Sequence, residues 1–194
     1  MTRQEQKDAR REQILDAGLD LFVRNGYHGT TSKEIAEALG ISPGLMFHYF
    51  KSKDELYIEL LTSLTKGMTG VAEMFDPARL NPLEIFEQMI GVILDSFRTF
   101  PRSAKYYMLV VQAKVCTRLT DGIKAAAQSV EDYAFFQPLI AAGQASGVIR
   151  GGDPAALAGL IHSALQGVAH THVCFPDIPL PDTRWIVDML RPEA

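Results

Sequence analysis

Residues 31–56, TSKEIAEALGISPGLMFHYFKSKDEL, decide the fold because they predict two short helices joined by a tight turn. Thr31 and Glu34 have the Thr-x-x-Glu spacing of a capping box, which marks the start of a helix. Ser42 and Pro43 begin the next helix with a capping hydroxyl and a ring that already has helical φ. A short turn that contains glycine is typical of a helix-turn-helix, whose second helix can enter a DNA major groove.

The segments on either side of this pair are also predicted to be helical. Two short helices cannot bury enough surface alone, and residues 12–25 supply an apolar stripe with the i, i+3, i+4, i+7, i+8 period. Residues 2–12 are a polar lead of mixed charge that precedes this helix, and we expect it to be frayed at its start. Ser52 and Glu55 form a second capping box, which predicts a helix over 52–75 that joins head to body without a flexible linker.

The rest of the chain continues the helical pattern. We expect helices over 82–100, 103–116, 121–146, 154–174 and 182–190, and we expect Pro138 to kink or break the third of these. Strand signals are weak, and there are no internal repeats. The sequence therefore predicts an all-α fold of about nine helices.

Composition places the chain among globular proteins and restricts how it could bind nucleic acid. Of its 194 residues, 47% are hydrophobic and 22% are charged, and the net charge is -4. Residues 1–53 carry eight Lys/Arg against seven Asp/Glu, whereas residues 54–194 carry eleven against sixteen. An acidic protein with a nearly neutral head would contact phosphates only locally, through that head.

Several classes of site and location are not expected. Cys116 and Cys174 make no disulfide framework, and no Cys-x-x-Cys metal spacing occurs. His170 and His172 point about 200° apart on a helix, so together with His162 and Cys174 they favour ordinary packing over a metal site. No apolar run has the roughly eighteen residues of a membrane span. Because residues 2–12 do not have the pattern of a secretory signal, the expected location is the cytoplasm. We expect no cofactor.

The first 60 or so residues resemble the DNA-binding head of the TetR family of one-component transcriptional regulators. The resemblance is carried by an ordered set of positions: 17–22, Gly26, Thr30-Thr31, Ile35-Ala36, Leu39-Gly40-Ile41-Ser42, Gly44, Phe47-His48-Tyr49-Phe50, Lys53 and Leu56. Residues 139–167 resemble the family's later helices more loosely. Residues 65–135 show no recognisable pattern.

The resemblance implies a homodimer with a three-helix DNA-binding head in residues 1–53. A helical-bundle body in residues 54–194 would bind an effector and dimerise. The protein would bind a palindromic operator, most often as a repressor, and be released by a small, largely apolar molecule. Neither the operator, the effector nor the choice between repressor and activator can be read from the sequence. The head positions that this implies for DNA binding are Thr31, Lys33, Ser42, Gly44, Leu45, Met46, His48, Tyr49 and Lys53.

One position departs from the family's pattern. Phe47 stands where many members carry a tyrosine that bonds to phosphate, so that hydrogen bond cannot form. Phe47 and Phe50 lie at i, i+3, and we expect both to pack in the core of the head. The resemblance implies that Lys33, Leu45 and Met46 face the DNA groove. It also implies that Thr31, Tyr49 and Lys53 approach phosphates.

In the body, we predict two further sites. Aromatic and Met-rich segments suggest an apolar effector pocket with few polar groups. Small residues along one helix stripe would let another helix approach closely, in a dimer interface or, alternatively, within one chain. The pocket candidates are Phe97, Tyr106, Tyr107, Met108, Gln112, Tyr133 and Phe136, and the interface candidates are Gly159, Ser163, Gly167, Trp185 and Met189.

Two other functions are compatible with the sequence. A helix-turn-helix protein could sense redox state through Cys116 rather than a ligand. An all-helical enzyme is the second, but it would need a nucleophile–base pair or a metal cluster, and none has a recognisable spacing in the sequence.

Overall fold

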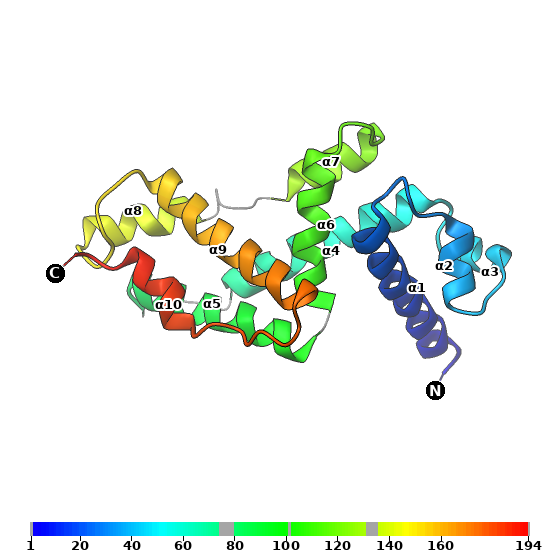
Figure 1. The fold of residues 1–194 in the computed structure, drawn as a ribbon, viewed down its shortest axis with the longest axis horizontal. Coiled ribbons are helices and arrows are strands. Elements are labelled where there is room, and N and C mark those ends of the chain that lie inside the picture. Colours follow the sequence, from blue (N-terminus) through cyan, green and yellow to red (C-terminus); the bar gives the residue numbers. More distant parts are fainter. Residues whose placement is uncertain (1, 74–79, 101, 131–135, 194) are drawn as a thin grey trace. The chain divides into compact units, whose positions relative to one another are not determined.

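The computed structural model describes residues 2–73, 80–100, 102–130 and 136–193, excluding the side chains of 64–73. Within these ranges all regular structure is helical, which confirms the predicted fold class (Figure 1). The helices are α1 (Arg3–Asn25), α2 (Ser32–Ala38), α3 (Pro43–Tyr49), α4 (Lys53–Glu73), α5 (Pro82–Thr99), α6 (Arg102–Val115), α7 (Asp121–Ser129), α8 (Gln137–Ala145), α9 (Pro154–Cys174) and α10 (Thr183–Val187), followed by a 3-10 turn, η2 (Asp188–Leu190).

The predicted caps of the helix-turn-helix are confirmed. The Thr31 hydroxyl accepts a hydrogen bond from the Glu34 backbone N–H at 3.2 Å, and the Glu34 carboxylate accepts one from the Thr31 N–H. The Ser42 hydroxyl accepts a bond from the Leu45 N–H at 3.2 Å. Gly40, with φ of 63°, makes the left-handed turn between the helices. Short-range hydrogen bonds therefore set both helix starts.

Helix α1 is longer than the apolar pattern indicated. It begins at Arg3 rather than near residue 12, so the expectation of a polar lead before the helix, frayed at its start, was wrong. Thr2 and Glu5 form a complete capping box, with the same spacing that predicted α2. The cap stabilises a helical extension whose side chains are almost all exposed.

The helical segment expected over 121–146, with a kink or break at Pro138, is broken. Helix α7 ends at Ser129, and α8 starts at Gln137 with Pro138 in its first turn. Proline is tolerated in the first turn of a helix because its missing N–H has no intrahelical partner there. The final helix expected over 182–190 likewise divides into α10 and the 3-10 turn.

The chain forms two compact units. The head unit comprises residues 1–64 and 105–130, and the body unit comprises residues 65–104 and 131–194. In the head unit α1, α2, α3, the start of α4, α6 and α7 share one apolar core, in which Phe22, Phe50 and Tyr57 are almost completely buried. Helices α6 and α7 thus contribute to the head's own core. The predicted functional boundary at residue 53 stays a prediction.

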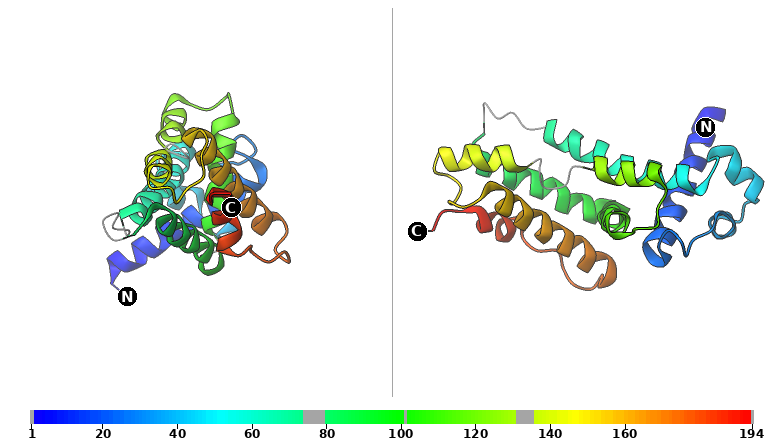
Figure 2. Two further views of the ribbon diagram at one scale, coloured as in Figure 1. Left: turned by 90° about the vertical axis from the view of Figure 1, so that its left-hand side faces the viewer. Right: turned by 90° about the horizontal axis from the view of Figure 1, so that it is seen from above.

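The body unit is built from α5, α8, α9 and α10. Helix α5 packs against α8 and α10, and α8 packs against α9 (Figure 2). The ring centroids of Phe86 and Phe136 lie 5.4 Å apart in its interior. The turn after α8 seats the side chain of Ile149 against Gly143, which leaves no room for a Cβ. No described helix is both long and apolar enough to cross a membrane.

Candidate nucleic-acid interface

Helix α3 has one buried and one exposed face. Met46 and Phe50, four residues apart, are fully buried in the head unit's core. Leu45 is 39% exposed and Phe47 is 47% exposed. The prediction that Met46 faces a DNA groove was therefore wrong, and so was the prediction that Phe47 packs in the core.

The exposed face of α3 is small, apolar and poor in hydrogen-bond donors. It presents Gly44, Leu45, Phe47 and His48. A Cβ on Gly44 would meet nothing closer than the Ser42 hydroxyl at 4.0 Å, so the backbone there is open to a partner. Tyr49 is half-buried, and its ring lies 5.5 Å from that of His48. Such a face can make apolar contacts with thymine methyl groups but few base-specific hydrogen bonds.

The two residues predicted to contact DNA from α2, Lys33 and its N-cap Thr31, differ in how free their side chains are to do so. Lys33 is exposed and forms only a surface ion pair with Glu37 at 3.4 Å, so its ammonium can reach a partner. The Thr31 hydroxyl donates to the Glu34 carboxylate at 2.8 Å while accepting the capping bond. Its phosphate contact stays a prediction, and it would require the hydroxyl to leave Glu34.

Lys53 is held inside the head rather than on its outer surface. Its Nζ donates to the carbonyl oxygens of Tyr27 and Thr30, each at 2.8 Å, and lies 4.0 Å from the centroid of the Tyr27 ring. Burial lowers the pKa of the Lys53 ammonium. Lys53 therefore ties the α1–α2 loop to α4, a geometry that does not support the predicted contact with phosphate.

An ion pair that the sequence pattern did not predict fixes α3 against its neighbours. Arg11 of α1 forms a two-pronged ion pair with Glu59 of α4, and its guanidinium carbon lies 4.7 Å from the centroid of the Phe50 ring. The bond to Glu59 raises the pKa of Arg11. Because Phe50 ends α3, a single side chain links three helices. The partners are 48 residues apart, so no local spacing indicates the pair.

A second network that was not predicted joins the first turn of α4 to two loops of the head unit. The Tyr27 hydroxyl donates to the Asp54 carboxylate, and the Thr120 hydroxyl donates to its other oxygen at 2.9 Å. The bond from Tyr27 is the main reason that the pKa of Asp54 lies below its usual value. The loop before α7 is thereby bonded to the α1–α2 loop through one carboxylate.

The predicted effector residues are divided between the two units. Phe97 and Phe136 are buried in the body unit, whereas Tyr106, Tyr107, Met108 and Gln112 belong to the head unit. The Gln112 amide donates to the Val23 carbonyl at 3.0 Å, and burial raises the pKa of Tyr107. Tyr133 lies outside the described residues. The role of this set as an effector site stays a prediction.

The small-residue stripe of α9 is open on its outer side. Ser163 and Gly167 are exposed, and a Cβ on Gly159 or Gly167 would meet no atom within 4 Å. Trp185 is 70% exposed, and Met189 is half-buried. In the described part of the body unit, we find no support for the alternative that another helix of the same chain packs on this stripe.

The described residues also bear on metal binding and redox sensing. Among them, no group of three or more His, Cys, Asp or Glu is placed to hold a metal ion. His172 bonds to the Phe97 carbonyl at 3.1 Å, and His170 lies 3.6 Å from the Cys174 sulfur. Cys116 is half-buried against the head core and Cys174 is exposed, so redox sensing through a cysteine stays open.

Comparisons with known proteins point to the same segment. Residues 14–60 match the family model described as bacterial regulatory proteins, tetR family. The HTH-type transcriptional regulator RutR of Escherichia coli is 31% identical over 120 residues, which cover 60% of this chain and 56% of RutR. The HTH-type transcriptional repressor KstR2 of Mycolicibacterium smegmatis is 27% identical over 116 residues, covering 60% and 54%.

A solved structure extends the likeness over nearly the whole chain. The MbdR regulator from Azoarcus sp. CIB superposes with a TM-score of 0.77 and 26% identity, covering 92% of this chain and 96% of MbdR. Each curated match described above spans just over half the length of the relative, and all three proteins are named as regulators or repressors rather than enzymes. Taken with the capped helix-turn-helix of α2 and α3, these matches identify the chain as a member of the tetR family of bacterial regulatory proteins.

Proposed function

We propose that this protein is a transcriptional regulator that binds operator DNA through α2 and α3 and acts as a repressor. The supporting observation is the arrangement of α3, whose inward face is fixed in the core while Gly44, Leu45, Phe47 and His48 remain outside. A recognition helix must be held rigidly and expose one face to bases. Its partner, chromosomal DNA, would place the protein in the cytoplasm.

Sequence discrimination would rest on few contacts. Lys33 is the exposed cation at the start of α2, His48 carries the polar atoms of the outer face of α3, and Leu45 and Phe47 offer apolar contact. With so few donors, we expect a large share of specificity to come from DNA shape and from thymine methyl groups.

The regulator would act as a homodimer on a palindromic site. An operator reader of this kind needs two heads at a fixed separation, because two recognition helices must enter successive major grooves. The open stripe of Gly159, Ser163 and Gly167 on α9 is the surface best suited to a symmetric contact with a second copy. Trp185 and Met189 would lie at the border of that contact.

A small, largely apolar effector would release the DNA. A groove of about 370 Å³ between α9 and residues 178–181 is lined mainly by apolar side chains, with Thr171 and His172 as its polar groups. That size and lining fit a small ligand. Helix α4 passes from the head unit into the body unit, so a ligand that favours one body conformation would shift the population of DNA-competent heads.

The proposal is tested by DNA binding of the purified protein. Fluorescently labelled duplexes covering the region upstream of its own gene should bind at low salt, and the affinity should fall linearly with log salt concentration. Lys33→Ala should weaken binding about 5- to 150-fold if the ammonium reads a base and lower the salt slope by about 1 if it contacts a phosphate. Absence of binding at every salt concentration would contradict the proposal and favour an all-helical enzyme instead.

A further inference from the structure

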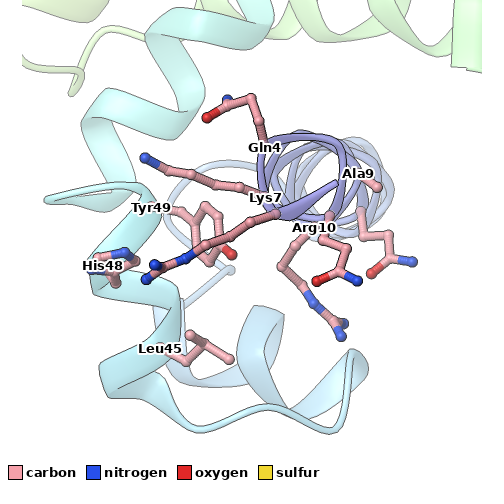
Figure 3. A pocket seen from close by; sticks show the side chains of 10 residues that line it. Gln4, Lys7, Ala9, Arg10, Leu45, His48 and Tyr49 are labelled. Carbon is pink, nitrogen blue, oxygen red and sulfur yellow. The ribbon is translucent and has the colours of Figure 1, made fainter. Parts of the chain in front are cut away.

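A groove separates the N-terminal turns of α1 from the outer side of α3. Its volume is about 1020 Å³, and it belongs entirely to the head unit (Figure 3). Lys7 and Arg10 extend from α1 on the groove side, and Leu45, His48 and Tyr49 line it from α3. The groove exists because the Thr2 capping box extends α1 beyond the apolar stripe that packs in the core.

The lining of this groove is strongly basic. Arg3, Lys7 and Arg10 supply three positive charges, and none of the residues that line it is an aspartate or glutamate. Arg3 and Lys7 are exposed and Arg10 is half-buried, so these cations can reach a partner without unfolding α1. Asp8 does not line the groove, and its carboxylate accepts a hydrogen bond from the Gln4 amide, which does, at 2.8 Å. A protein with a net charge of -4 thus carries a local cationic surface beside its recognition helix.

We propose that this groove binds the sugar–phosphate backbone of one DNA strand, next to the major groove that α3 enters. The proposal rests on the proposed function. Arg3, Lys7 and Arg10 lie at i, i+4 and i+7 on one helix face and span about 10 Å along α1. One DNA strand places a phosphate about every 3.4 Å of helix axis, so a span of about 10 Å covers about three phosphate intervals and lets each cation reach a different phosphate.

This assignment separates two tasks within the head. The outer face of α3 would distinguish base sequences, because it presents the side chains that can reach base edges. The α1 groove would supply affinity without sequence preference, because phosphates are the same in every sequence. Leu45 and His48 belong both to the outer face of α3 and to the lining of the α1 groove. A DNA strand whose phosphates lie in the groove would therefore place its neighbouring bases next to α3.

The test compares two triple variants of the full chain. Arg3→Gln/Lys7→Gln/Arg10→Gln removes the groove's charges and keeps a good helix former at each position. Arg98→Gln/Arg184→Gln/Arg191→Gln removes the same charge from exposed positions of the body unit. Affinity for an operator duplex and for a scrambled duplex of equal length is measured by fluorescence anisotropy between about 50 and 200 mM KCl. Circular dichroism verifies that each variant is folded.

The groove variant should lower the slope of log affinity against log salt by about 0.9 per lost phosphate, up to about 2.7 per head. Over this salt range, wild-type affinity should therefore fall roughly 40-fold further per head than that of the variant. Both duplexes should lose affinity by a similar factor, whereas the body control should keep the wild-type slope. Lys7→Gln alone, at an exposed position, should lower the slope by about 0.9 even if the triple variant misfolds.

Two results would overturn the assignment. A groove variant with the wild-type slope would show that no phosphate binds there, and a loss confined to the operator duplex would show that these residues read bases. Both outcomes leave wild-type binding intact, so only the groove assignment would fall. If wild-type protein binds neither duplex at any salt concentration, the proposed function and the phosphate groove fall together.

Discussion

The head unit and the body unit each have an apolar core, and they differ in how far buried or half-buried polar side chains link their helices. In the head unit, polar side chains join helices that are distant in sequence, as Arg11 and Glu59 do and as the tyrosine–aspartate–threonine network around Asp54 does. In the body unit the interior is mainly apolar, with contacts such as that between Phe86 and Phe136. Directional bonds fix orientation, whereas apolar burial mainly fixes compactness.

The difference indicates what each unit must preserve. Helix α3 can match a DNA groove only at a fixed angle, and the guanidinium of Arg11 over Phe50 supports that angle. The body unit leaves its small residues on an open surface of α9, and the proposed dimer contact there would depend on close approach more than on direction. Four substitutions test this comparison, in order of decreasing effect.

The largest effect is expected on the inward face of α3. Phe50→Ala should lower the free energy of unfolding by about 3–5 kcal/mol, because it empties a fully buried site beneath Arg11. Phe47→Ala, on the outward face, should change stability by less than about 0.5 kcal/mol. Urea unfolding followed by circular dichroism measures both. Equal losses for the two variants would contradict the assigned orientation of α3.

A second substitution tests the open surface of the body unit. Gly167→Arg should dissociate a dimer into monomers and weaken operator binding by about 10²- to 10⁴-fold, because two linked heads bind far more tightly than one. A Cβ at this position meets nothing within 4 Å in the single chain, so a side chain can begin there without a backbone shift. Gly151→Arg, at a similarly open loop position, is the matched control. Sedimentation velocity gives the oligomeric state, and an unchanged dimer would exclude this stripe as the interface.

Packing inside the body unit is tested by a pair of glycines. A Cβ on Gly143 would lie 2.4 Å from Cδ1 and 2.6 Å from Cγ1 of the buried Ile149, so Gly143→Ala should cost about 1–3 kcal/mol. A Cβ on Gly91, inside α5, would meet only the Thr183 hydroxyl oxygen at 3.9 Å, so Gly91→Ala should stabilise the protein by about 0.5–1 kcal/mol. Thermal unfolding distinguishes the two, and a stabilising Gly143→Ala would disprove the close contact.

The smallest effect concerns pH and the carboxylate of the head unit. The hydrogen bond from Tyr27 holds the pKa of Asp54 below its unfolded value of about 3.9. The ionised carboxylate therefore stabilises the fold above that pH, and the stabilisation is lost as the pH falls from about 5 through the folded pKa. Wild type should be more stable than Asp54→Asn at about pH 7, and the difference should shrink towards about pH 3.

A difference that stays constant with pH would exclude a role for the charge of Asp54. Asp95→Asn provides the control, because Asp95 is exposed and pairs with Arg98 only on the surface of α5. Its effect on stability should be small at every pH. Urea unfolding at several pH values measures all three proteins.

The sequence predicted those features that depend on near neighbours. The starts of α2 and α3 follow from caps that act over three residues, and both are confirmed. The start of α1 could have been found in the same way, because Thr2 and Glu5 repeat the Thr-x-x-Glu spacing. It was missed because an apolar stripe was required, and the first turns of α1 have none.

Features that depend on distant partners were not predictable. Which of Met46 and Phe47 is buried depends on which side of α3 packs against α1 and α4. The residues of the Arg11–Glu59 ion pair are 48 positions apart. The sequence predicts Gln112 as part of a ligand pocket, but its amide donates a hydrogen bond to the Val23 carbonyl of α1, 89 residues away. The proposed effector site has no local spacing that would identify it.

The central claim is that α3 presents a sequence-reading face and that two copies act together. It is tested most directly by incubating the purified protein with a pool of random duplexes and sequencing those that remain bound. The account predicts enrichment of an inverted repeat whose half-sites fall on successive major grooves. Recovery of single half-sites or of no common sequence, at any salt concentration, would contradict it.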